Sequence, residues 1–321
     1  FEIRNGFFFT PLNQFNIHWE VKANGRSLKK GTITRPDVLP QSKMDILLNY
    51  AEGLEQIPGA EYYIYFSAVT AEAAPLVPAG HELAHEQLLL PVNFPVDATS
   101  TGAMPKLSHS SNSLQYIVSG ENFRIIFSKM SMSITSYEFK GTILMNNSAN
   151  PEFWRAPTDN DFGNGMQNRC NVWKTAGSSK SNRNVSLEEV SPTELKITFT
   201  YDLTAVSSTY TTIYTVYGNG EVIVDNSMEY KGSNLPELPR FGMRFELPEA
   251  LEQVEYFGRG PFENYWDRKT AAMIDRYRST VTGMYYPYPS PQENGNRTDT
   301  RWLAPTNEAG TGLLFSGMNT F

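Results

Sequence analysis

Short runs of alternating apolar and polar residues, separated by turn sequences, recur along this 321-residue chain and constrain its fold more than any other feature. Residues 16–23 alternate in this way, and Asn24-Gly25 separates them from a similar run at 28–33. A period of two is typical of a half-buried strand, and Asn-Gly is a strong hairpin signal. Strand-like runs also occupy residues 3–9, 46–48, 62–69 and 81–90. This spacing of short strands and turns predicts an immunoglobulin-like β-sandwich over residues 1–92.

The strand pattern resumes further along the chain and is too long for a second unit of that size. Strands are expected at 116–118, 123–127, 131–134, 142–145, 195–201, 209–217, 222–228, 240–246 and 254–258. No convincing helix separates them, and no repeat of roughly 20–50 residues is found. The fold class is therefore predicted to be all-β, with a large two-sheet sandwich over residues 113–321. Residues 93–112 lose the apolar periodicity, are rich in Pro, Ser, Thr and Gly, and are predicted to be a linker.

The charge balance and the few cysteines and histidines exclude several classes of function. Thirty-four acidic against 27 basic residues leave a formal charge of −7, which disfavours nucleic acid and anionic membranes as partners. Cys170 is the only cysteine and the chain has four histidines, so neither a disulfide framework nor a structural zinc site is expected. No histidine follows His109, so a Ser–His–Asp triad cannot form within the second domain.

Polar and aromatic residues concentrate in three clusters of the second domain. The first runs from Phe153 to Gly165, where Pro157 and the Asp, Asn and Gly residues predict a tight ordered loop, and Trp173 to Gly177 follows it. The second is Gly258 to Arg268, and the third is Tyr285 to Trp302. Each combines aromatic rings with carboxylate, amide and guanidinium groups, as sugar-binding sites do.

The same clusters also suit a purely structural role. In that interpretation the arginines pair with carboxylates inside the protein. The expected pairs are Arg155 with Asp161, Arg259 with Glu263, and Arg268 with Asp267. Residue types alone leave both interpretations open.

Two of these groups invite a catalytic or metal interpretation. Glu263 and Glu293 would suit glycoside hydrolysis if their carboxyl groups lay about 5–9 Å apart, although carboxylates in arginine-rich turns are usually salt-bridged. Asp159-Asn160-Asp161-Phe162-Gly163 begins like a calcium loop. It lacks the remaining ligand spacing and the terminal glutamate, so no metal site is predicted.

The clusters carry a family resemblance. Arg155 to Gly163, followed by Trp173 to Gly177, closely resembles the opening of the C-terminal domain of bacterial β-galactosidases of glycoside hydrolase family 2. Asn24-Gly25 and Ala79 to Ala84 resemble the immunoglobulin-like domain that precedes it, so almost the whole chain is covered in the family's order. Further matching runs are Gly260 to Tyr265, Asp267-Arg268 with Thr270-Ala271, Met284 to Tyr288, Gln292 to Gly295, and Thr300-Arg301.

The resemblance implies a retaining enzyme that hydrolyses terminal β-D-galactosides and has five domains. This chain would supply the last two, the second being a galactose-mutarotase-like supersandwich that is incomplete because the family's domain continues beyond Phe321. The catalytic glutamates are implied to lie on a (β/α)₈ barrel, and the divalent metal and sodium on other domains. The chain is then expected to hold no catalytic residue and no cofactor, and to be inactive by itself.

The resemblance also implies that the last domain helps to wall the mouth of the active site, with a mobile loop around Gly177. A tryptophan that some members place after the Thr-Arg motif has no counterpart here, because Trp302 comes too early. This difference leaves the disaccharide preference open. The predicted substrate-proximal residues are Trp173, Gly177, Arg155, Asp159, Asn160, Asp161, Glu263, Asn264, Glu293 and Asn294.

The expected partners are β-galactoside sugars bound through the parent enzyme, the catalytic barrel domain, and a second copy in a homo-oligomer, with neither nucleic acid nor a membrane. Two alternatives stay open. One is a free-standing carbohydrate-binding module. The other is an aldose-epimerase-like enzyme on the same sandwich, whose chemistry would need histidine acid and base partners that the second domain lacks.

Overall fold

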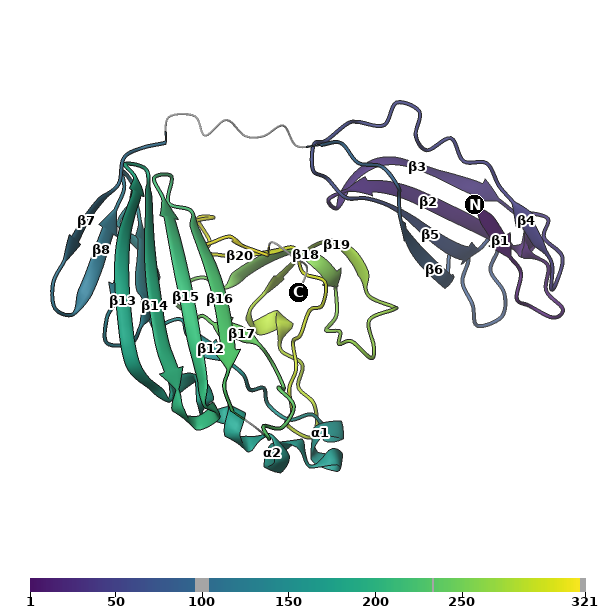
Figure 1. Cartoon of the computed structure of the whole chain (residues 1–321). Helices are drawn as coiled ribbons and strands as arrows, with labels where there is room; N and C mark the ends of the chain where they lie inside the picture. The colour runs from purple at the N-terminus through teal and green to yellow at the C-terminus, as the bar shows by residue number, and fades with distance from the viewer. Residues whose placement is uncertain (96–103, 233, 318–321) are drawn as a thin grey trace.

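The computed structural model describes residues 1–95, 104–232 and 234–317, and it is built almost entirely from antiparallel sheets (Figure 1). The all-β fold class is therefore confirmed. The α-helices are limited to α1 (Asp159–Asn164) and α2 (Met166–Arg169) within the described residues. No helix in this part of the chain is long and apolar enough to cross a bilayer.

The first domain is centred on a four-stranded sheet in the order β3-β2-β5-β6. Its strands are β2 (Phe15–Ala23), β3 (Arg26–Thr34), β5 (Tyr62–Thr70) and β6 (Glu82–Leu89). Positive φ angles of 45° at Asn24 and 78° at Gly25 close the predicted β2–β3 hairpin. The short strands β1 (Glu2–Arg4) and β4 (Lys43–Asp45) pair beside the sheet, so the strand predicted at 46–48 lies too late.

Two sheets of the second domain enclose the largest core. One has the order β11-β10-β9-β8-β7 and the other β13-β14-β15-β16. Tyr214 on the second sheet meets Phe127 on the first, with ring centroids 5.2 Å apart. The strands of the first sheet are β7 (Ser108–Ser111), β8 (Gln115–Ser119), β9 (Phe123–Ser128), β10 (Ser133–Phe139) and β11 (Thr142–Met145). Those of the second are β13 (Lys180–Ser191), β14 (Glu194–Leu203), β15 (Ser208–Tyr217) and β16 (Val222–Tyr230).

Strand β7 corrects the predicted linker at 93–112, part of which lies outside the described residues. Ser108–Ser111 carry no apolar side chain, yet they pair with β8 as the edge of the five-stranded sheet. Hydrophobic periodicity cannot reveal a fully exposed edge strand of this kind. His109 therefore belongs to the second domain, where its Nε2 lies 2.6 Å from an oxygen of Glu189 on β13.

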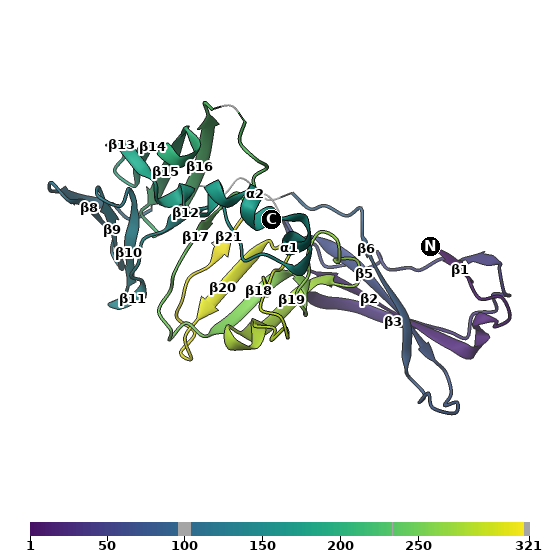
Figure 2. The ribbon, with the colours of Figure 1, turned by 90° about the horizontal axis from the view of Figure 1, so that it is seen from below.

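A third sheet, β19-β18-β20-β21, joins the second domain to the first. Its strands are β18 (Gln253–Gly260), β19 (Met273–Thr280), β20 (Trp302–Thr306) and β21 (Phe315–Ser316). The short strands β12 (Asn150–Glu152) and β17 (Gly242–Arg244) pair separately. Figure 2 shows β18 and β19 beside the first domain.

The contact between the domains combines ion pairs with an apolar patch. Arg301 donates to both carboxylate oxygens of Glu61, at 2.8 and 2.7 Å, and to the hydroxyl of Tyr63 at 3.0 Å. Beside them the buried side chains of Tyr63, Phe257 and Ile274 form a small core. The Thr300-Arg301 motif is therefore used, through its arginine, to hold the two domains together.

Candidate functional site

The third polar cluster touches both of the others, so the three clusters form one continuous network. Gln292 accepts a hydrogen bond from the backbone N–H of Asp159 at 3.2 Å, and Glu293 accepts one from Ala156 at 3.0 Å. On the other side Asn296 accepts from the backbone N–H of Asn264 at 2.9 Å. Segments more than 130 residues apart are thus joined at one place.

The segment expected to be a tight loop is a short helix, α1. Thr158 accepts from the backbone N–H of Asp161 at 3.2 Å, and Asp161 accepts from that of Thr158 at 2.9 Å, which is a capping box. Gly165, with φ of 75°, ends the helix. The correction has a plain cause: the Thr-x-x-Asp spacing gives a start signal that outweighs the glycine and asparagine of the segment.

Both carboxylate oxygens of Asp161 accept hydrogen bonds from other residues of the protein. Arg155 lies 2.8 Å from one of its oxygens, so the structural pairing predicted for these two residues is correct. Asp159 and Asn160 are exposed on α1. The described residues contain no group of three or more His, Cys, Asp or Glu side chains placed to hold a metal ion.

The turn at Glu263 and Asn264 is buried and fully partnered. Glu263 accepts from Arg268 at 2.6 Å, from the backbone N–H of Gly295 at 2.7 Å and from the hydroxyl of Tyr288. Burial by itself would raise the pKa of Glu263, but these donors together hold that pKa below its usual value. Arg268 therefore pairs with Glu263 and not with Asp267, and Arg259 pairs with Asp299.

Asn264 is the hub of this turn. It is 0% exposed, and its amide donates to the carbonyls of Arg259 at 3.1 Å and Phe262 at 3.0 Å. Its oxygen accepts from the backbone N–H and the hydroxyl of Thr298, at 2.8 and 2.5 Å. All four bonds are internal, so Asn264 is a structural anchor.

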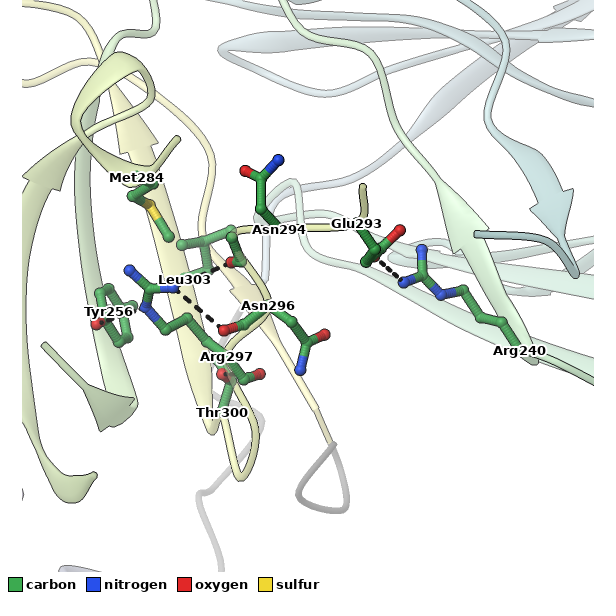
Figure 3. A pocket seen from close by; sticks show the side chains of 10 residues that line it. Arg240, Tyr256, Met284, Glu293, Asn294, Asn296, Arg297, Thr300 and Leu303 are labelled. Atoms are coloured by element: carbon green, nitrogen blue, oxygen red, sulfur yellow. Dashed lines mark hydrogen bonds and ion pairs between the residues drawn. The ribbon is translucent and has the colours of Figure 1, made fainter. Parts of the chain in front are cut away.

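A cavity of about 340 Å³ opens beside this network (Figure 3). Arg240 reaches across from just before β17 and lies 2.7 Å from Glu293. On the opposite side the guanidinium of Arg297 lies 5.8 Å from the ring centroid of Tyr256 and donates to its hydroxyl at 3.1 Å. The remaining lining residues are Met284, Asn294, Gly295, Asn296, Thr300 and Leu303. The apolar side chains Tyr256, Met284 and Leu303 lie on the Arg297 side, across from Arg240. A lining of this composition suits a small polar ligand that also has an apolar face.

Trp173 and Gly177 lie away from this cavity. The Trp173 side chain is only 4% exposed, belongs to the main core and donates from its ring N–H to the carbonyl of Pro236 at 3.2 Å. A Cβ on Gly177 would stand 2.2 Å from the carbonyl oxygen of Pro151, so this glycine permits a close backbone contact. In this structure the Trp173 ring fills the core, and the mobile loop expected around Gly177 stays a prediction.

Glu263 and Glu293 are both held by partners within the protein. The pKa of Glu263 is lowered by its three donors, whereas a general acid at neutral pH needs a raised pKa. Glu293 accepts from Arg240 and from the backbone N–H of Ala156. Both carboxylates therefore anchor loops.

Two models of known protein families match the chain along most of its length. Residues 119–320 match the family model described as "Beta galactosidase small chain", and residues 1–91 match "Beta-galactosidase, domain 4". The chain belongs to the β-galactosidase family. The resemblance to part of a bacterial β-galactosidase is thereby confirmed.

Curated relatives agree with this assignment. The chain is 33% identical over 321 residues to a β-galactosidase of Priestia megaterium, covering all of this chain and 31% of that protein. β-Galactosidases of Halalkalibacterium halodurans and Streptococcus thermophilus are 28% and 26% identical, over 97% and 99% of the chain and 30% of each relative. The chain thus spans about a third of the length of the curated relatives it matches.

The sequence did not point to several residues that line the cavity. Arg240 follows Pro239 in a proline-rich stretch, and Leu303 is an ordinary apolar residue. Arg297 lies inside the third cluster but outside the matching Thr300-Arg301 motif, whose arginine lies at the domain contact instead. Only the tertiary arrangement shows which of these residues line the cavity and which lie at the contact between the domains.

Proposed function

We propose that this chain is the non-catalytic C-terminal portion of a retaining β-galactosidase that hydrolyses terminal β-D-galactosides. It supports a catalytic barrel outside this chain and helps to wall the substrate entrance. The observation that carries the proposal is the match of two β-galactosidase family models, which together cover almost the whole chain. The internal partners of Glu263 and Glu293 agree with a non-catalytic role, because both carboxylates are used to hold loops of the domain.

Within this function the cavity between Arg240 and Arg297 forms the part of the entrance wall nearest the substrate. The Arg240 side chain is 38% exposed, so water or a sugar hydroxyl can reach its guanidinium. Tyr256, Met284 and Leu303 offer an apolar surface to the C–H face of a sugar ring. Of the predicted substrate-proximal residues, Glu293 and Asn294 line this cavity, and Asp159 is hydrogen-bonded to Gln292, the residue before Glu293.

The test is a chimera of the P. megaterium β-galactosidase in which this chain replaces the segment that it matches. Hydrolysis of a chromogenic β-galactoside is measured for the chimera, for the P. megaterium enzyme with that segment deleted, and for this chain alone. We expect activity only in the chimera. Turnover by the isolated chain at a rate close to that of the chimera would place the chemistry within these 321 residues and overturn the proposal.

A further inference from the structure

Three consecutive phenylalanines stand out from the first domain in the loop that follows β1. The exposed fractions of Phe7, Phe8 and Phe9 are 42%, 73% and 94%. Single exposed apolar residues are common, but three adjacent aromatic rings form a concentrated apolar surface. We call Phe7, Phe8 and Phe9 the phenylalanine knob.

The backbone that presents the knob is firmly fixed. Asn5, 1% exposed, donates to the carbonyls of Thr10 and Val38 at 2.9 and 3.0 Å and accepts from the backbone N–H of Phe7 at 2.9 Å. Gln41 adds side-chain bonds to the carbonyls of Gly6 and Phe7, at 2.9 and 3.1 Å. Both ends of the loop are therefore tied down. A surface that is already ordered loses little entropy on binding, which favours its use as an anchor.

The second domain of this chain does not cover the knob. In both views β1 lies at the end of the first domain that points away from β18 and β19 (Figures 1 and 2). The contact between the domains uses other residues, chiefly Glu61, Tyr63 and Arg301. An anionic bilayer is also a poor partner, because the chain has a formal charge of −7 and no basic run longer than Lys29-Lys30.

From these observations we infer that the knob docks into an apolar pocket on the part of the β-galactosidase that lies outside this chain. The inference rests on the proposed function. The share of the relative that this chain covers supports the inference. The chain spans only 31% of the P. megaterium relative, so most of such an enzyme lies outside the matched segment and is available to contact the knob. Exposed aromatic side chains on a rigid loop are typical anchors of a contact between folded domains.

Side-chain footprinting by hydroxyl radicals tests this inference without a mutation. The active chimera and the isolated chain are oxidised in parallel, and modification of each side chain is read by mass spectrometry. We expect oxidation of Phe8 and Phe9 to fall severalfold in the chimera. Leu47 and Leu76, which are 98% and 104% exposed on the same domain, serve as matched controls and should be oxidised equally in both proteins.

A pair of double variants gives an independent reading. Phe8→Ser/Phe9→Ser should leave the melting temperature of the isolated chain unchanged, since both rings are exposed there, and should shorten the half-life of chimera activity on heating severalfold. Leu47→Ser/Leu76→Ser should change neither quantity. An active chimera with fully oxidised Phe8 and Phe9 and an unaffected double variant overturns the inference while the proposed function stands. An inactive wild-type chimera counts against the proposed function and removes the basis of the inference.

The competing occupant is a second copy of this chain. Footprinting and sedimentation of the isolated chain over a range of concentrations decide this point. Protection of Phe8 and Phe9 that grows with dimer formation, and is lost in Phe8→Ser/Phe9→Ser, would assign the knob to self-association and overturn the inference. A monomer with freely oxidised Phe8 and Phe9 supports it.

Discussion

The dipeptide Glu-Asn occurs twice in the three polar clusters, as Glu263-Asn264 and Glu293-Asn294, and the two copies have different surroundings. Asn264 is completely buried and makes four internal hydrogen bonds. Asn294 lines a cavity and makes two longer bonds, each 3.2 Å, with the backbone of Tyr286 and Gln292. Glu263 joins neighbouring loops, whereas Glu293 meets Arg240 and Ala156 from other parts of the domain.

This difference shows that the same residue types can stabilise the fold in one place and line an accessible cavity in another. At the first pair every polar group is matched inside the protein, so a ligand would have to displace an existing bond. At the second pair the partners are partly exposed, and a ligand could bind without breaking the fold. The comparison predicts large losses of stability at Glu263-Asn264 and small ones at the cavity.

The largest effect is expected for Asn264→Ala. The substitution leaves two carbonyls, one N–H and one hydroxyl without their partners in a buried turn. At about 1 kcal/mol for each lost bond, we expect the free energy of unfolding to fall by about 4 kcal/mol. Urea denaturation followed by fluorescence measures it. Asn294→Ala is the matched control. It loses two longer and less buried bonds and should cost no more than about 2 kcal/mol, so equal losses at both positions would contradict the difference between the two sites.

The next effect is expected for Glu263→Gln, and it depends on pH. The substitution removes a buried charge that Arg268, Tyr288 and Gly295 stabilise, at a cost of about 2–3 kcal/mol at neutral pH. Because the pKa of Glu263 is lowered by folding, its ionised form stabilises the native state fully above the ordinary value of about 4.3. This contribution is lost as the pH falls through the lowered pKa of the folded state.

The stability difference between wild type and Glu263→Gln should therefore be constant from about pH 6 to 8 and should shrink as the pH falls below about 4.3. Urea unfolding at a series of pH values measures it. A difference that grows on acidification would mean that folding raises the pKa of Glu263, and the assignment of this residue as an anchor would fail.

A third test concerns Arg301. Like the residues of the Glu263-Asn264 site, it is bonded to several partners within the protein. Burial would raise the pKa of Glu61, but Arg301 and Tyr63 hold that pKa below its usual value. Arg301→Ala should cost about 2 kcal/mol and should allow the two domains to move apart. Small-angle scattering should show an increased radius of gyration. Arg301→Lys keeps the charge but loses the two-point contact, and it should give an intermediate result.

The sequence predicts strands well where apolar residues are frequent. The expected bounds 142–145 equal those of β11, and β2, β5, β14 and β15 differ by only one or two residues at their ends. Prediction fails where the strand is largely polar. β13 is largely exposed, and β19 carries Asp275, Arg276 and Arg278, so neither shows a continuous apolar face.

The site could be foreseen only in part, because composition locates polar clusters but not their partners. The meeting of Gln292 and Glu293 with the start of α1 depends on how distant strands pack, and no local pattern encodes it. Burial decides the role of Trp173, whose ring looked suitable for a sugar but fills the core. Motifs that identify a family therefore need not mark the residues that face its substrate.

The smallest effect on stability is expected at the cavity, where Arg240→Gln tests the second half of the comparison. Its side chain is 38% exposed, so loss of the contact with Glu293 should cost no more than about 1 kcal/mol. In the chimera we expect KM for a β-galactoside to rise about fivefold, equivalent to one hydrogen bond of about 1 kcal/mol, with kcat little changed. Arg124→Gln, an exposed arginine on β9, is the control and should change neither stability nor KM. An unchanged KM in Arg240→Gln would mean that the cavity does not contact the substrate. Both Glu-Asn pairs would then be structural elements of a supporting domain.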